Sequence, residues 1–130
     1  MLNEAIKAVE EYRSVLNTSD VNEVNKWISS EFIGYFGYYN DRDYEVYNGD
    51  SYKRSNIETF ESYKGQNPQW QYTDLTRNCR SENEIIYSTI IDFYLSGEKV
   101  ASALAIEIFK KEQEGWRLYR QHMERYSSGW

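Results

Sequence analysis

The first quarter of the chain has the polar and apolar pattern of two helices. Apolar side chains recur at helical spacing in the opening segment: Leu2, Ala5, Ile6, Val9, Tyr12 and Leu16. The polar residues 17–20 interrupt this pattern, and Asp20 with Glu23 three residues later is typical of a capped helix start. We therefore expect an amphipathic helix and then a short second helix that ends near Ile28.

An aromatic strand and a third helix are expected next. Residues 31–39 carry aromatic or aliphatic side chains on both faces of an extended chain: Phe32, Ile33, Tyr35, Phe36, Tyr38 and Tyr39. A turn at residues 40–43 and a short return strand lead to Asn48-Gly49, after which Asp50 or Ser51 is positioned to cap a helix. Gly65 is expected to end that helix.

The second half of the chain predicts an antiparallel meander. Residues 84–95 and 100–111 are long runs with apolar side chains on both faces, separated by a turn at Ser96-Gly97. A second turn at Glu114-Gly115 introduces the last strand, and residues 70–80 alternate weakly before the first run. Helices followed by a meander predict an α+β fold, with the helices packed on one face of a curved, mostly antiparallel sheet.

The two-sided strands also predict an assembly. If helices cover one face of the sheet, apolar residues on the other face, among Ile86, Ile90, Ala103 and Ala105 or their alternates, need cover as well. A second copy of the chain is the simplest source, so we expect a homodimer packed sheet to sheet.

Length and composition narrow the class of protein. A chain of 130 residues is expected to form a single domain, residues 1–130. The net charge of −6 argues against nucleic-acid and anionic-membrane partners, which attract basic surfaces. Tyrosine (13) outnumbers phenylalanine (5), and tyrosine suits half-wet cavities because its ring is apolar and its hydroxyl is polar.

Cofactors, disulfides and membrane insertion are not expected. Cys79 is the only cysteine, so neither an intrachain disulfide nor a multi-cysteine metal site can form. The sequence contains no glycine-rich nucleotide motif, phosphate loop or nucleophile elbow. Its start is amphipathic and acidic, unlike a signal peptide, and no apolar run approaches a membrane span, so we expect a cytoplasmic protein.

The order of elements and the last strand resemble a known superfamily. The sequence Gly115-Trp116-Arg117-Leu118, with His122 further on, is similar to the final strand of small bacterial nuclear transport factor 2-like proteins. That group includes ketosteroid isomerase, SnoaL-type polyketide cyclases and the association domain of calcium/calmodulin-dependent kinase. The resemblance implies a cone-shaped, cystatin-like fold, with Arg120 replacing a histidine and Glu124 replacing a common serine.

The last strand also carries the first candidate site. Residues two apart on a strand share a face, so Trp116, Leu118, Arg120, His122 and Glu124 are expected on one surface. We predict that this surface lines the cone. There His122 would serve as acid or base, Arg120 would hold an anion, and Glu124 would orient the imidazole. The alternative is a strand-end network in which the three side chains satisfy one another.

Two carboxylates interrupt apolar strands. Asp92 within residues 84–95 and Glu107 within residues 100–111 are each costly to bury unless they are paired or have raised pKa values. Asp92 is a candidate acid or base. The structural alternatives are an Asp92 that is exposed or paired with an arginine or lysine, and a Glu107 paired with Arg117 or Arg120 on the next strand.

Aromatic residues from several elements are candidates for a ligand-binding cavity. They are Trp27, Tyr35, Tyr39, Tyr63, Trp70, Tyr87 and Trp116. An aromatic cavity with a few polar groups is typical of a small-molecule site, although core packing accounts for the same residues. The leading prediction is a cone-fold protein that binds a small, partly apolar ligand. The alternatives are an isomerase, cyclase or dehydratase using His122 or Asp92, and an oligomerisation module with a vestigial cavity.

Overall fold

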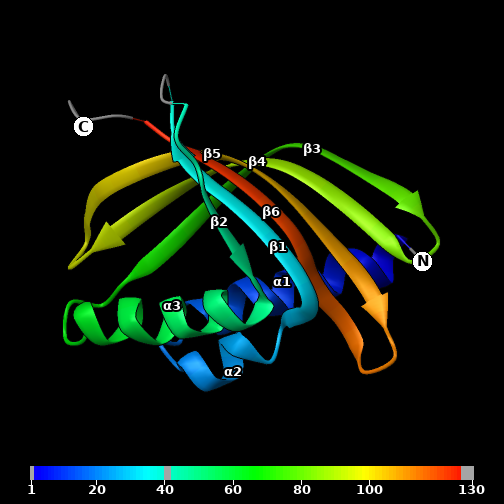
Figure 1. The fold of residues 1–130 in the computed structure, drawn as a ribbon, viewed down its shortest axis with the longest axis horizontal. Helices are drawn as coiled ribbons and strands as arrows, with labels where there is room; N and C mark the ends of the chain where they lie inside the picture. Colours follow the sequence, from blue (N-terminus) through cyan, green and yellow to red (C-terminus); the bar gives the residue numbers. More distant parts are fainter. Residues whose placement is uncertain (1, 40–41, 127–130) are drawn as a thin grey trace.

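A strongly curved sheet and three helices make up the molecule in a computed structural model that describes residues 2–39 and 42–126 (Figure 1). The helices are α1 (Leu2–Leu16), α2 (Val21–Asn25) and α3 (Gly49–Ser62). The strands are β1 (Ile28–Tyr38), β2 (Glu45–Asn48), β3 (Gln69–Ser81), β4 (Glu84–Leu95), β5 (Glu98–Glu112) and β6 (Gly115–Arg125). The sequence prediction of an α+β fold with early helices and a mostly antiparallel sheet is confirmed.

The six strands form one sheet in the order β2-β1-β6-β5-β4-β3. All neighbours are antiparallel except β1 and β6, which run parallel and bring the first and last strands together. Figure 1 shows all three helices on the concave side of this sheet, with α3 lying along its open end. The helices and the curved sheet therefore enclose a cone.

Local sequence explains most of the helix ends. The side chain of Asp20 accepts a hydrogen bond from the backbone N–H of Glu23 at 3.2 Å, which is the expected cap of α2. Helix α3 begins earlier than predicted, because Asn48, not Asp50 or Ser51, is its N-cap. Asn48 accepts from the N–H of Ser51, and the Ser51 hydroxyl accepts from the N–H of Asn48.

The core lies between α1 and the narrow end of the cone. Its fully buried aromatic and aliphatic side chains come from α1, β1, β4, β5 and β6: Val9, Tyr12, Phe32, Ile85, Tyr87, Phe109 and Leu118. The ring of Phe109 meets the ring of Tyr12 edge-on at 5.4 Å between centroids. This packing closes the narrow end and leaves the wide end between α3 and the sheet.

One glycine of β1, Gly34, leaves room for the rings of Phe32 and Phe36. A Cβ atom added to Gly34 would lie 2.7 Å from ring atoms of both Phe32 and Phe36. A larger residue at position 34 would therefore displace one of those rings, and Phe36 is part of a wall of the pocket described below.

No helix in residues 2–39 or 42–126 combines the length and apolar character that crossing a membrane requires.

Candidate functional site

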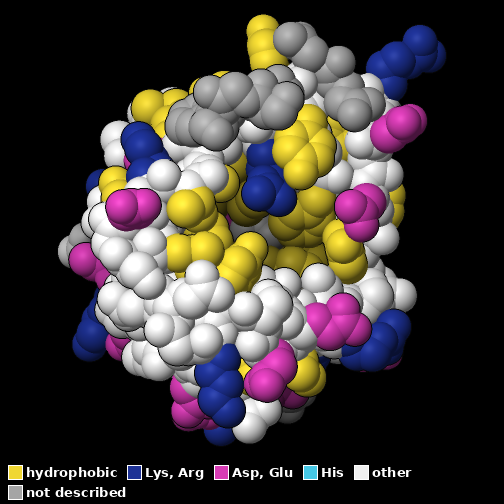
Figure 2. All heavy atoms as spheres, turned by 90° about the vertical axis from the view of Figure 1, so that its left-hand side faces the viewer, with side chains coloured by type: hydrophobic (Ala, Val, Ile, Leu, Met, Phe, Trp, Pro, Cys, Tyr) yellow, Lys and Arg dark blue, Asp and Glu magenta, His cyan; other side chains and the backbone are white. Residues whose placement is uncertain are grey.

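A pocket of about 340 Å³ opens at the wide end of the cone, between α3 and the concave face of the sheet. Figure 2 shows this hollow from its open side, with hydrophobic side chains over most of its surface and a basic side chain within it. Its lining includes side chains from α1, α3 and all six strands, among them Phe36, Tyr47, Tyr52, Phe60, Tyr63, Trp70, Tyr72, Phe93, Gln121, Met123 and Arg125.

One wall of the pocket is a stack of aromatic rings. Trp70 of β3 lies against Phe60 of α3, with ring centroids 5.6 Å apart and planes 22° apart. Phe93 of β4 lies 4.8 Å from Trp70 and 5.2 Å from Tyr63. The ring of Phe93 faces the pocket because Ala101, its partner on β5, is too small to cover it.

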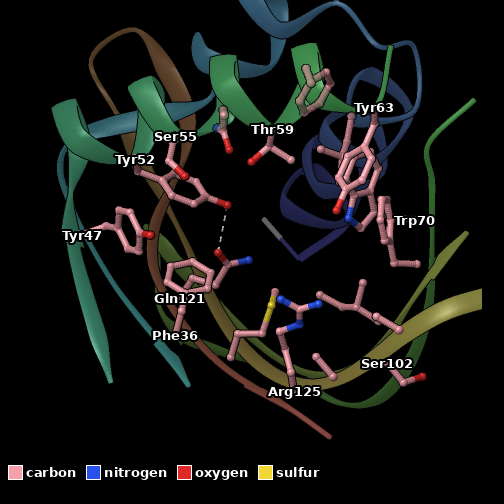
Figure 3. Close-up of a pocket in the computed structure, with 18 of the residues that line it drawn as sticks. Phe36, Tyr47, Tyr52, Ser55, Thr59, Tyr63, Trp70, Ser102, Gln121 and Arg125 are labelled. Atoms are coloured by element: carbon pink, nitrogen blue, oxygen red, sulfur yellow. Dashed lines mark hydrogen bonds between the residues drawn. The ribbon is translucent and has the colours of Figure 1, made fainter. Parts of the chain in front are cut away.

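The opposite wall is also aromatic and comes from β1, β2 and α3. The ring of Tyr52 stacks on Phe36 at 5.5 Å and on Phe32 at 4.6 Å. Tyr47 meets Phe36 edge-on at 5.3 Å. The two walls face each other across the cavity in Figure 3.

Polar groups at the bottom of the pocket are joined in a chain. The Tyr52 hydroxyl donates to Oε1 of Gln121 at 3.1 Å, drawn as the dashed line in Figure 3. Gln121 Nε2 donates in turn to Oε2 of Glu107. The amide of Gln121 is thus held from both sides and is presented to the cavity in one orientation.

Glu107 is a fully buried carboxyl behind that amide. Burial raises the pKa of Glu107, while the positive charge of Arg13 and the hydrogen bond from Gln121 oppose the rise. Oε1 of Glu107 has no hydrogen-bond partner among the described residues. The sequence analysis expected Arg117 or Arg120 as its partner, but Gln121 of the neighbouring strand takes that place.

Arg13 of α1 supplies the nearest positive charge to this buried group. Its guanidinium donates two hydrogen bonds to Asp74, at 2.8 and 3.0 Å, and lies 4.1 Å from the ring centroid of Tyr72. Burial raises the pKa of Tyr72 far above its ordinary value, and the charge of Glu107 raises it further. Tyr72 therefore remains a neutral phenol at the floor of the pocket.

A bulge in β6 decides which side chains reach the pocket. Leu118 pairs with Phe109 and Arg120 pairs with Ile108, so Tyr119 is an extra residue in β6. The alternation of faces is reset there. Leu118 lies in the core, and after the bulge Gln121, Met123 and Arg125 line the cone.

The prediction that Arg120, His122 and Glu124 line the cone is therefore wrong. The bulge places all three on the convex face of the sheet. Arg120 donates to the carbonyl of Glu31 at 2.8 Å, and its guanidinium lies 3.9 Å from the ring centroid of Tyr119.

His122 is exposed and belongs to a cluster on that convex face. Its ring lies 5.4 Å from the ring of Tyr44 and 6.2 Å from that of Tyr35. The hydroxyl of Tyr44 donates to Glu124 at 2.7 Å. Neither His122 nor Tyr35 is positioned to act inside the cone.

Asp92 also lies outside the cone. It pairs across the sheet with Ser102, whose hydroxyl donates to its carboxylate, and Lys99 Nζ lies 3.9 Å from the same oxygen. The residues on either side of it, Ile91 and Phe93, line the pocket, so alternation directs Asp92 to the other face. The structural alternative, a carboxylate paired with lysine, describes this residue.

The predicted aromatic residues separate into three groups. Tyr63 and Trp70 line the pocket. Tyr87 and Trp116 are buried in the core, and Trp27 packs against it, so these three are structural. Tyr39 is exposed near the end of β1 and contacts the ring of Tyr126.

The sequence analysis missed several lining residues, chiefly Tyr52, Gln121, Met123 and Arg125. Tyr52 lies among polar residues in the first turns of α3, so no apolar pattern in the sequence marks it. The other three follow the bulge, and no sequence signal marks its position. The small residues Ala101 and Ala103 of β5 were the available hint, because a strand of small side chains leaves room above the sheet.

Neither a second hollow nor the arrangement of possible metal ligands offers a better candidate site among the described residues. A second hollow of about 390 Å³ lies beside the C-terminal half of α3, but it is formed largely by exposed loop residues, including Lys64 and Asn67. Within residues 2–39 and 42–126, no group of three His, Cys, Asp or Glu side chains is arranged to hold a metal ion. The cone pocket is therefore the candidate site, because hydrogen-bonded buried groups converge on it.

Comparison with known proteins identifies the fold. No protein-family model and no curated protein matches this sequence. Among solved structures, a cystatin-like domain of unknown function from Nostoc punctiforme is 13% identical, with 98% of this chain and 79% of that chain covered at a TM-score of 0.70. A ketosteroid isomerase-like protein from Erwinia carotovora atroseptica is 16% identical, with 97% and 96% covered at a TM-score of 0.68.

A third solved structure is named as a nuclear transport factor 2-like protein, after the superfamily that the last strand resembles. A nuclear transport factor 2-like protein of unknown function from Shewanella oneidensis is 9% identical, with 94% of this chain and 97% of that chain covered at a TM-score of 0.72. At such low identity these matches speak to architecture alone. The fold implied by the last strand is confirmed, and the chain has the nuclear transport factor 2-like, cystatin-like fold.

Proposed function

We propose that this protein binds a small, partly apolar molecule in the cone pocket. The observation that carries the proposal is the pocket itself: about 340 Å³, walled by aromatic rings and floored by the oriented amide of Gln121. Ligand pockets are commonly about 300–1,000 Å³, mostly apolar, with a few fixed polar groups. An open aromatic pocket whose polar floor is held in place by hydrogen bonds supports ligand binding rather than a vestigial cavity.

The alternative function, an enzyme that uses His122 or Asp92 as acid or base, is not supported by the positions of these two residues. His122 and Asp92 both lie on the convex side of the sheet, away from the cavity. Glu107 is the buried carboxyl nearest the pocket, but it is not part of the lining, because Gln121 stands in front of it. Its role in this arrangement is to position the amide.

A ligand screen with a pocket-filling variant tests the proposal. Thr59 of α3 points into the cavity (Figure 3), so Thr59→Trp is expected to occupy it. A ligand at 100 times its Kd adds about 2.7 kcal/mol to the free energy of unfolding, which raises Tm by several degrees. We expect compounds that raise the Tm of the wild type to leave the Tm of Thr59→Trp unchanged.

Glu58 provides the matched control for that screen. It precedes Thr59 on α3, is exposed and is not part of the pocket lining. Glu58→Trp adds the same indole outside the cavity and should keep the ligand response of the wild type. An equal response from Thr59→Trp would place binding elsewhere and refute the cone pocket as the site.

We also propose that two copies of the chain pack together through the convex sheet face. Ile86 and Ile90 of β4 and Leu104 of β5 are only half-buried there, and Ile106 is 43% exposed. Apolar side chains in adjacent positions on two strands favour burial against another protein surface.

Light scattering after size exclusion should give twice the chain mass of 15.6 kDa at micromolar concentration. Ile106→Lys places a charge at the centre of this surface, so it is expected to yield the monomer without unfolding the chain. A wild type that elutes as a monomer would contradict the sheet-to-sheet dimer.

A further inference from the structure

Arg125 is the one basic residue that the described part of the chain contributes to the lining of the largely aromatic pocket, and it lies at the pocket mouth. In Figure 3 its side chain points from β6 into the cavity, between the two aromatic walls. The register places Arg125 beside Ala103 of β5 and Tyr38 of β1. Because Ala103 ends at its methyl group, the guanidinium has room to lie over the sheet and reach the cavity.

Among the described residues, Arg125 has an aromatic contact and no salt bridge. Its guanidinium lies 5.4 Å from the ring centroid of Tyr38. Within the described ranges, 2–39 and 42–126, the salt bridges do not include Arg125. The carboxylate of the lining, Glu45, accepts a hydrogen bond from the Tyr47 hydroxyl at 2.9 Å on β2.

An apolar ligand entering this pocket would remove part of the water around the guanidinium of Arg125, which is exposed at the mouth. Losing water without gaining a partner is unfavourable for a charged group. The binding free energy of an uncharged ligand is therefore less favourable than the burial of its apolar surface alone would give. A carboxylate restores the lost interactions, because both of its oxygens can accept from the planar fork of arginine.

We propose that the ligand is an aromatic carboxylate, with its ring between the Trp70 and Tyr52 walls and its carboxylate on Arg125. This inference rests on the proposed function and adds a ligand class to it. The stacked rings of Phe60 and Trp70, with Phe93 tilted against Trp70, favour a flat ring system over a flexible chain, since ring faces pack best against planar partners. The carboxylate remains near the opening, where Arg125 is still reached by water.

Three compounds that share one ring system test the ligand class. Calorimetric titration of the full chain with 2-naphthoate, 2-naphthamide and 2-naphthylmethylammonium varies the charge while the rings stay constant. We expect 2-naphthoate to bind about 10- to 100-fold tighter than 2-naphthamide, the range for a hydrogen-bonded charge. The ammonium compound is expected to bind more weakly than the amide because it approaches a like charge.

Variants of β6 then assign the preference to Arg125. Arg125→Gln should remove the advantage of 2-naphthoate and leave the affinity for 2-naphthamide unchanged. Arg120→Gln removes the same charge from the convex face of the same strand and should preserve the full preference.

The outcomes separate the two proposals. Equal affinity for the acid and the amide, or a preference for the ammonium compound, would refute the carboxylate class and leave a pocket that binds apolar rings. A preference for the acid that survives Arg125→Gln would also refute it. Failure of all three compounds to bind the folded wild type would count against the ligand pocket as well.

Discussion

Replacing Gln121 by leucine is expected to lower the free energy of unfolding by about 3 kcal/mol, since the change leaves a buried carboxyl unsatisfied. Gln121 is 3% exposed, accepts from the Tyr52 hydroxyl and donates to Glu107. Leucine fills similar volume but offers neither group. Urea titration of wild type and variant at neutral pH measures the difference.

The neighbouring residue provides the matched control. His122 is exposed on the convex face, where it contacts the rings of Tyr35 and Tyr44. His122→Ala is expected to change the free energy of unfolding by less than about 0.5 kcal/mol and to leave the ligand response of the pocket intact. If His122→Ala were the more damaging of the two, the assignment of faces after the bulge would be wrong.

A double variant identifies the source of the loss. Replacing both hydrogen-bonding partners by apolar groups is often nearly neutral, whereas replacing one is not. Glu107→Leu combined with Gln121→Leu should therefore recover much of the stability lost in Gln121→Leu. A double variant less stable than Gln121→Leu would show that the buried carboxyl is not the group left unsatisfied.

Replacing Glu107 by glutamine is expected to change the pH dependence of stability. The pKa of Glu107 is raised in the folded protein, mainly because the carboxyl is fully buried. The unfolded chain therefore loses this proton at lower pH than the folded chain. The contribution of Glu107 is most favourable below the ordinary glutamate pKa of 4.5, and it is lost as pH rises through the raised value.

Glu107→Gln does not titrate at this position, so its stability relative to the wild type should improve as pH rises above 4.5. Each unit by which the folded pKa exceeds the unfolded one contributes about 1.4 kcal/mol to that change. Urea titrations at pH 4 and pH 8, on both proteins, measure it. A difference between variant and wild type that stays constant with pH would contradict a raised pKa.

The exposed carboxylate Glu10 on α1 provides the comparison for this experiment. Glu10→Gln removes the same charge from the outer face of a helix. It is expected to shift the free energy of unfolding by less than about 0.5 kcal/mol at either pH.

The helices, the hairpins and the fold class were predictable because their signals are local. The amphipathic spacing of α1, the Asp20 cap of α2 and the turns at Ser96-Gly97 and Glu114-Gly115 each depend on residues close together in the sequence. The order of these elements then restricts the ways in which helices can cover a sheet.

The candidate site was predictable only in part. Tyr63 and Trp70 were identified because large aromatic residues from different elements converge in such a fold. Tyr87 and Trp116 are the same residue types and lie in the core instead. Whether an aromatic side chain meets another side chain or open space depends on partners distant in the sequence, and here the small residues Ala101 and Ala103 leave the space.

By itself, the sequence determined the α+β architecture and most of the strand segments. Only the tertiary structure decided that Gln121 and Arg125 face the cavity while His122 does not. The physical reason is the single extra residue at Tyr119, which appears only when β6 is paired with β5. A shift of one residue exchanges the two faces of a strand, and strand pairing, unlike periodicity, is a property of two segments brought together by the fold.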